Sequence, residues 1–353
     1  MAARTIRLAV IGGDGIGPEV TDAALKVLDA CEERFGFKTV RERIGWSSAR
    51  YLETGERVTP EMIDGLRAFD AIFLGALGDP RVPRGLMERD VLIGLRRRLD
   101  LYVNLRPIVL YDERLCPLKD KSVREVRFFV MRENTEDVYA QEGVREGTGA
   151  AETARVEMKF TRPGVERIVR YAFERARELP RRHVTLVDKA NAIPVQEIWR
   201  EVFEEIGKGF PDVARDAMYV DAAAMWMVLK PEQFDVVVTT NLFGDILTDL
   251  GAALIGGLGA AASGNIHPGK VSMFEPIHGS APKYAGKGVA SPVGAIGAVA
   301  LMLDFLGETE GRSAINESLI SGFRTGRIRG VDAGSGGTME VAEVVASGVR
   351  QTR

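Results

Sequence analysis

Two aspartates four residues apart are the feature of this sequence that most directly suggests chemistry. Asp245 and Asp249 follow the apolar, β-branched run Phe234–Thr239, which predicts a buried strand. The residues after Gly244 follow a helical pattern, so the two carboxylates would stand one above the other. Like charges at this spacing repel unless a cation lies between them, and oxygen ligands suit Mg²⁺ or Mn²⁺. The alternative is that Asp245 is a first-turn residue favoured by the helix dipole and Asp249 is solvated. The apolar residues of this helix are spaced for one buried face: Ile246, Leu247, Leu250, Leu254 and Ile255.

Three arginines near the ends of predicted elements form a second candidate group. Arg96 closes a predicted helix, Arg106 ends a strand-like run and Arg132 ends a strand. Guanidinium groups bind carboxylates with two parallel hydrogen bonds, so the group suits an acidic small molecule. A solvated surface arginine is the alternative for each. It fits less well for Arg106 and Arg132, which adjoin apolar strand segments.

Lys189 and Tyr139 are candidates for proton transfer. Lys189 follows the predicted strand His183–Val187 and is flanked by small residues. A lysine held away from water near other cations can act as a base, although an exposed lysine is the commoner case. Tyr139 comes soon after Arg132, where its phenol could share the same site; a core tyrosine is the alternative.

Two glycine-containing segments could lie against a nucleotide. The turn Gly12–Glu19 follows the predicted strand Ile6–Ile11, but its glycine spacing departs from the dinucleotide fingerprint, so a tight turn is the favoured interpretation. The loop Phe274–Gly288 contains His278, whose flat ring could stack on a base. A structural loop is the alternative there.

The composition describes an ordinary globular protein. A chain of 353 residues is more consistent with two domains than one, and 45% hydrophobic and 27% charged residues are typical of soluble proteins. The net charge of −3 argues against nucleic acid or an anionic membrane as partner. Cys31 and Cys116 provide no disulfide framework. The sequence shows neither the apolar core of a signal peptide nor an apolar run long enough to span a membrane, so we expect a cytoplasmic protein.

Strands and helices alternate along the chain, which predicts an α/β fold. Further strands are predicted at Asp70–Gly75 and Arg124–Met131, and helices at Arg162–Glu178 and Val195–Ile206. Residues 142–157 carry alternating charges among small residues and predict an exposed arm that could pair with another subunit.

Taken together, these segments closely resemble the β-decarboxylating dehydrogenases, the family of the isocitrate, isopropylmalate, homoisocitrate and tartrate/malate dehydrogenases. The resemblance rests on motifs in the family's order, over nearly the whole chain: GDGIGPE, NLRP, RENTE, DKAN, VDAAAM, NLFGDILTD, ASGNI and HGSAP. It implies a doubly wound α/β fold with two domains, unlike the Rossmann fold. Residues 1–101 and 257–353 would form a large cofactor-binding domain, and residues 102–256 a middle domain with the dimer interface and the metal carboxylates.

The resemblance also implies roles for individual residues. Asp221, Asp245 and Asp249 would hold Mg²⁺ or Mn²⁺, with Asp221 supplied by the neighbouring subunit of a homodimer and also close to the substrate. Arg96, Arg106 and Arg132 would hold the carboxylates of a 2-hydroxy diacid. Tyr139 and the neighbour's Lys189 would form the acid–base pair. The cofactor would be held by these residues: Gly75, Glu275, His278, Gly279, Ser280, Ala281, Lys283, Tyr284 and Ser291.

The expected reaction is oxidation of the 2-hydroxy group followed by loss of CO₂. In the family that the chain resembles, substrate selectivity is attributed to the side chains just before the first arginine, here Leu92 and Ile93. This apolar pair would leave an extra carboxylate unpaired but accept a branched alkyl group. We therefore expect 3-isopropylmalate, converted to 4-methyl-2-oxopentanoate in leucine biosynthesis, with isocitrate, homoisocitrate and tartrate/malate as alternatives.

The cofactor is expected to be NAD. Lys283 and Tyr284 are similar to residues of NADP-dependent relatives, and NAD-dependent members usually carry aspartate at position 283, so NADP is the alternative. The further tyrosine and arginine of NADP-dependent relatives are missing near Val331 and Ser335. A non-catalytic regulatory subunit is disfavoured because none of the following is lost: Tyr139, Lys189, Asp221, Asp245 and Asp249.

Overall fold

The chain folds into two compact units in a computed structural model that describes residues 4–141 and 143–351. The first unit consists of Met1–Leu101, Pro107–Val126 and Ala252–Arg353, and the second of Tyr102–Arg106 and Arg127–Gly251. Strand β4 (Val103–Val109) and helix α8 (Asn241–Leu254) each contribute residues to both units.

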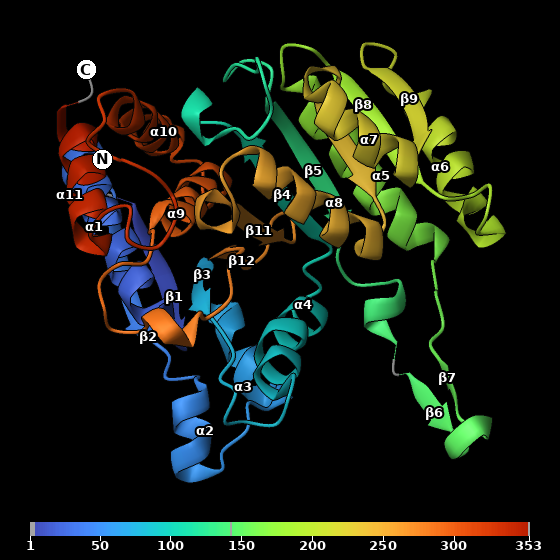
Figure 1. Cartoon of the computed structure of the whole chain (residues 1–353), viewed down its shortest axis with the longest axis horizontal. Helices are drawn as coiled ribbons and strands as arrows, with labels where there is room; N and C mark the ends of the chain where they lie inside the picture. The colour runs from blue at the N-terminus through green and yellow to red at the C-terminus, as the bar shows by residue number, and fades with distance from the viewer. Residues whose placement is uncertain (1–3, 142, 352–353) are drawn as a thin grey trace. The chain divides into compact units, whose positions relative to one another are not determined.

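The first unit contains a sheet with the strand order β2-β1-β3-β12-β11 (Figure 1). Strands β2, β1, β3 and β12 run parallel, and β11 is antiparallel to β12. Their bounds are Thr5–Gly13 (β1), Lys38–Arg43 (β2), Ala71–Ala76 (β3), Ala262–Ile266 (β11) and Ser272–Pro276 (β12). Strand β3 is buried along its whole length, as expected for a parallel strand covered on both faces.

Helices cover both faces of this sheet, which confirms the doubly wound α/β arrangement. On one face α1 packs on β1 and β3, and α9 packs on β11 and β12. On the other, Ala9 and Ile11 join a core with Ile63 of α3 and Leu95 of α4. The helices are α1 (Gly17–Phe35), α2 (Ser48–Thr54), α3 (Pro60–Gly65), α4 (Gly94–Arg98), α9 (Val293–Phe305), α10 (Thr309–Arg324) and α11 (Thr338–Gln351).

The second unit contains the parallel strands β5, β10, β8 and β9 in that order. They span Arg127–Glu133 (β5), His183–Asp188 (β8), Ala214–Tyr219 (β9) and Val236–Thr239 (β10). Helices α5 (Arg162–Arg177) and α6 (Glu197–Gly207) pack against them, and α7 (Val220–Leu229) contacts β8 and β9. The Thr161 side chain begins α5 by accepting a hydrogen bond from the Gly164 amide.

A two-stranded antiparallel sheet projects from the second unit, where the sequence predicts an exposed arm (Figure 1). Its strands are β6 (Val144–Glu146) and β7 (Thr153–Arg155), and all their residues are exposed. Glu142, where the predicted arm begins, lies outside the described residues. In the described part of the chain, no helix is both long and apolar enough to cross a membrane.

Two details differ from the sequence-based expectations. Residues 107–126, inside the predicted middle domain, are grouped with the first unit, where Tyr111 stacks on Phe323 and Arg114 Nη2 donates to the Phe323 carbonyl oxygen at 2.8 Å. The buried face predicted for α8 was wrong at Ile246, which is 58% exposed. Met225 and Leu229 of α7 are exposed as well, so the second unit presents apolar helix residues that this chain alone leaves uncovered.

Burial of Cys31 in α1 predicts a loss of stability at alkaline pH. Burial raises the pKa of this thiol from 9.0 to about 12. Above pH 9 the unfolded chain therefore releases a proton that the folded chain retains, and the free energy of unfolding should fall by up to about 1.4 kcal/mol per pH unit. Denaturant unfolding between pH 9 and 10 would measure this slope. Cys31→Ala should be less stable but show a shallower slope; an unchanged slope would contradict the assignment.

Candidate active site

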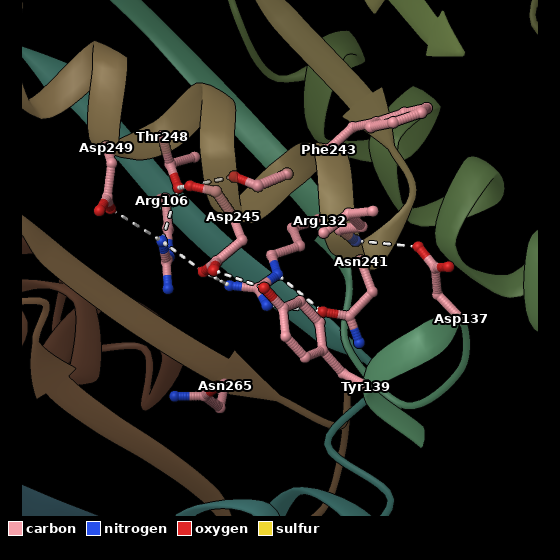
Figure 2. Close-up of polar contacts among 12 residues, drawn as sticks. Arg106, Arg132, Asp137, Tyr139, Asn241, Phe243, Asp245, Thr248, Asp249 and Asn265 are labelled. Atoms are coloured by element: carbon pink, nitrogen blue, oxygen red, sulfur yellow. Dashed lines mark hydrogen bonds and ion pairs between the residues drawn. The ribbon is translucent and has the colours of Figure 1, made fainter. Parts of the chain in front are cut away.

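Helix α8 carries the two aspartates of the predicted metal site. It begins at Asn241, directly after β10, so Asp245 lies beyond the first turn and the helix-dipole explanation does not account for it. The Nη1 atom of Arg106 lies 3.7 Å from Asp245 Oδ1 and 3.8 Å from Asp249 Oδ1. Figure 2 shows both carboxylates directed toward this guanidinium. The two aspartates therefore converge on one position already occupied by positive charge.

Arg132 approaches the same helix from β5. Its side chain is almost completely buried and forms an ion pair with Asp245. Its Nε and Nη2 atoms donate to Asn241 Oδ1, at 2.9 Å and 2.6 Å. Asn241 thus fixes the plane of the guanidinium and leaves Nη1 for Asp245. The buried Arg106 is held in a similar way, because its Nη1 donates to Thr248 Oγ1 at 2.5 Å.

Tyr139 joins this group through its hydroxyl, which donates to Asp245 Oδ2 at 3.0 Å. The ring also lies against Arg132, whose Cζ is 5.5 Å from the ring centroid. Burial raises the pKa of Tyr139, and the negative charge of Asp245 raises it further. The phenol is therefore a protonated group placed beside a carboxylate, as a proton donor requires.

Lys189 and Asp221 form a separate pair in the same unit. Lys189 follows β8, Asp221 lies in the first turn of α7, and their side chains form an ion pair. The ammonium lowers the pKa of Asp221, whose side chain is 68% exposed. The backbone amide of Lys189 donates to Gln196 at 2.7 Å, which holds the start of this loop.

No cluster of three or more acidic, histidine or cysteine side chains that could hold a metal is found in residues 4–141 and 143–351. Asp245 and Asp249 offer oxygen donors around a position that accepts a cation, and this fits Mg²⁺ or Mn²⁺. Further ligands would have to come from water, substrate or a second chain. The supply of Asp221 by a neighbouring subunit stays a prediction.

Arg96 lies in the first unit, at α4, and has polar partners there. Its Nε donates to Asn265 Oδ1 at 2.9 Å and its Nη2 lies 3.3 Å from Glu275 Oε1. Asn265 Nδ2 donates to the same oxygen at 2.8 Å. Glu275, predicted to contact the cofactor, therefore also orients the arginine predicted to contact the substrate. Asn265, which lies in the ASGNI motif, was not among the predicted site residues, yet it contacts both Arg96 and Glu275.

Leu92 and Ile93 end a short π-helix, Glu88–Ile93, immediately before α4. Both are partly buried, and Leu92 packs against the core of the first unit. The preceding Asp90 is held by two hydrogen bonds from Arg57, at 2.7 Å and 2.6 Å. The negative charge of Asp90 is thereby balanced by Arg57. Leu92 and Ile93 remain an apolar pair, as expected for recognition of a branched alkyl group.

The glycine-rich turn after β1 contacts the predicted cofactor loop. The Ile16 amide donates to the carbonyl oxygen of Ser280 at 2.8 Å. A Cβ on Gly15 would overlap that oxygen, so this glycine permits close backbone approach. Gly75 is likewise enclosed: a Cβ there would overlap the carbonyl oxygen of Gly12. Its position inside β3 gives it a packing role whether or not a cofactor lies nearby.

The remaining predicted cofactor residues lie in one loop region of the first unit. Burial lowers the pKa of His278, which favours the neutral ring, and its buried Nε2 has no hydrogen-bond partner among the described residues. The ammonium of Lys283 lies 4.7 Å from the centroid of the Tyr284 ring. Gly279 is exposed, and Ala281 has a left-handed backbone with φ 39°. Ser291 donates to the Gly259 carbonyl at 3.3 Å.

Comparison with known proteins establishes the class of this chain. The family model described as isocitrate/isopropylmalate dehydrogenase matches residues 7–345. The chain therefore belongs to the isocitrate/isopropylmalate dehydrogenase family, and it is a β-decarboxylating dehydrogenase.

Individual relatives cover nearly the whole chain. A 3-isopropylmalate dehydrogenase of Thermobifida fusca is 45% identical over 99% of both chains, and one of Beutenbergia cavernae is 46% identical over 98% of this chain and 99% of the relative. Among solved structures, an isocitrate dehydrogenase from Methylococcus capsulatus superposes with a TM-score of 0.87 at 37% identity, covering 98% of this chain and 100% of that one.

Replacement of Asp245 should change the ionisation of Tyr139. In Asp245→Asn the neighbouring negative charge is lost, so the pKa of the phenol should fall, because phenolate formation is no longer opposed by Asp245. Titration of ¹³Cζ-labelled tyrosine by NMR would measure the shift, and Tyr139→Phe would identify the signal. Asp249→Asn removes the same charge one helical turn away and should lower the pKa less. An unchanged or raised pKa in Asp245→Asn would contradict this geometry.

Proposed function

We propose that this enzyme catalyses the metal-dependent oxidative decarboxylation of 3-isopropylmalate to 4-methyl-2-oxopentanoate and CO₂ in leucine biosynthesis, with NAD as hydride acceptor. The observation that carries this proposal is the convergence of Asp245 and Asp249 on Arg106, beside Arg132 and Tyr139. Close relatives named 3-isopropylmalate dehydrogenase support the choice of substrate.

Each group has a role suited to its environment. Arg106 and Arg132 are buried cations that would bind and orient the carboxylates of a diacid. Arg96, fixed by Asn265 and Glu275, would contribute a third guanidinium. When bound, a divalent ion supplies Lewis-acid polarisation of the new 2-oxo group and NAD supplies the hydride acceptor.

Proton transfer would use Lys189 and Tyr139. Lys189, provided by a second copy of the chain, would act in its neutral amine form and take the proton of the substrate hydroxyl, becoming an ammonium as the hydride leaves C2. After CO₂ has left, Tyr139 would return a proton to C3 of the enol. The raised pKa of Tyr139 keeps this proton on the phenol until it is needed.

The choice of substrate within the family rests on Leu92 and Ile93. Isocitrate and homoisocitrate carry an additional carboxylate, which this apolar pair would leave without a partner. The neighbouring Asp90 is an acidic side chain and would repel a third carboxylate rather than bind it. Its own charge is balanced by Arg57. A branched alkyl substituent therefore fits best.

The preference for NAD over NADP is part of the same proposal. Lys283 is the cation that could meet a 2′-phosphate, but its ammonium lies over the ring of Tyr284. Neither Val331 nor Ser335 provides a further positive charge. Among these positions, Lys283 alone carries a positive charge that could bind the 2′-phosphate of NADP.

A homodimer with shared active sites completes the proposal. Lys189 and the exposed Asp221 form one ion pair, so a second chain could deliver both at once. The exposed apolar residues of α7 and α8, among them Met225, Leu229 and Ile246, support an interface that includes these helices.

A panel of substrates tests the assignment. Isopropylmalate, isocitrate, homoisocitrate and tartrate should each be assayed with NAD and NADP, with Mn²⁺ and with chelator. We expect isopropylmalate with NAD to give the highest kcat/KM, at least about tenfold above isocitrate, because an unpaired carboxylate in an apolar pocket is costly. Chelator should abolish turnover. A higher kcat/KM with isocitrate would contradict the role assigned to Leu92 and Ile93 in selecting a branched alkyl substrate.

Hybrid dimers test whether the active sites are shared. Asp221→Asn and Asp245→Asn should each be inactive alone. In an equal mixture that exchanges subunits, half of the dimers are hybrids in which one site receives intact Asp221 from one chain and intact Asp245 from the other. About a quarter of the wild-type activity should therefore return. If Asp221 served its own chain, every site would retain one substitution and no activity would return.

A further inference from the structure

Asp137 is a fully buried aspartate in an unusual backbone conformation close to Tyr139. Its φ is 70° and its ψ is −164°, a combination that is essentially restricted to glycine. Non-glycine residues persist in such conformations only when the surrounding structure holds them there. The contacts of this residue therefore point to a specific task.

The carboxylate of Asp137 joins two elements of the site. One oxygen accepts a hydrogen bond from the Val138 amide at 2.7 Å and so caps the short 3-10 helix Val138–Ala140, which carries Tyr139. The other oxygen accepts from the Leu242 amide at 2.9 Å, in the first turn of α8. The first amides of a helix lack partners within the helix, and a carboxylate satisfies them well. Figure 2 shows Asp137 beside this end of α8.

Neighbouring contacts strengthen the same connection. The Asn241 side chain donates to the carbonyl oxygen of Glu136 at 3.0 Å while its own oxygen holds Arg132. The amide of Asp137 donates to the Lys159 carbonyl at 3.0 Å, which fixes the outer side of the turn. The turn that carries Tyr139 is thus tied to the same end of α8 from which Arg132 is oriented.

Tyr139 depends on this turn for its position. Its side chain is 42% exposed, so close packing on all sides does not hold the ring. The hydroxyl nevertheless reaches Asp245, one turn further along α8. We propose that Asp137 is a positioning residue that keeps the Tyr139 phenol at Asp245 by tying the tyrosine turn to the start of α8. The inference rests on the proposed function in one respect: the phenol acts as the proton donor.

Asp137→Gly tests this role directly. Glycine accepts the observed φ and ψ without strain, so the substitution removes the carboxylate while the backbone remains permitted. We expect kcat to fall at least about tenfold, because a displaced catalytic group transfers its proton poorly, with KM for the diacid changed less than about threefold. Asp120→Gly is the matched control, because Asp120 is an exposed aspartate with φ 57°. It should leave both constants unchanged.

Asp137→Asn provides the conservative comparison and does not depend on the fate of the glycine variant. The amide oxygen can still accept one of the two backbone hydrogen bonds, so kcat should lie between those of Asp137→Gly and the wild type. Melting temperatures would identify a variant that fails to fold. If Asp137→Gly does not fold, Asp137→Asn alone must lower kcat more than KM changes, and wild-type kinetics would overturn the proposal.

A double-mutant cycle with Tyr139→Phe separates positioning from general damage. If Asp137 acts through the phenol, Asp137→Gly should cost little further kcat in the Tyr139→Phe background. An undiminished additional loss would show that Asp137 acts elsewhere and would overturn the proposal.

The NMR signal of ¹³Cζ-labelled Tyr139 gives a readout independent of turnover. Loss of the hydrogen bond to Asp245 should shift this signal in Asp137→Gly and not in Asp120→Gly. If wild-type enzyme turns over none of the diacids but the shift occurs, the proposed function fails and the positioning role stands. If wild-type enzyme is active while Asp137→Gly changes neither the shift nor kcat, the positioning role fails alone.

Discussion

The second unit depends on a balance between buried guanidinium groups and the carboxylates of α8. Arg106 and Arg132 are almost fully buried, and an uncompensated buried cation would be strongly unfavourable. Asp245 and Asp249 supply the opposite charge, while Asn241 accepts hydrogen bonds from Arg132 and Thr248 accepts one from Arg106. One helix therefore both stabilises the cations that suit a diacid and presents the carboxylates that suit a metal. This double role of α8 explains why so many polar residues lie in the short segment after β10.

Much of the fold and part of this site could be predicted from the sequence. The apolar run before Thr240 and the spacing of Asp245 and Asp249 indicated a strand, a helix and two carboxylates on one face, and the structure contains all three. Ile246 was predicted to be buried and is exposed, because periodicity shows which residues share a face but not what covers that face.

The connections between distant segments could not be predicted in the same way. Asp137 and Asn241 are ordinary loop and helix residues in the sequence, and their roles arise only where the RENTE segment meets the start of α8. The turn at Gly15 is similar: its glycines resemble a nucleotide-binding pattern, yet Gly15 itself permits a close contact with the Ser280 backbone. Local spacing identifies residue types, whereas tertiary contacts decide which partner each one serves.

The position of Arg106 near two aspartates also determines how their charges are balanced within the chain. Because a guanidinium already offsets the two negative charges, the carboxylates do not face their full mutual repulsion. The charges of this segment are therefore balanced within the chain itself. Removal of the divalent ion that we propose would return this segment to the same balance rather than leave two carboxylates facing each other.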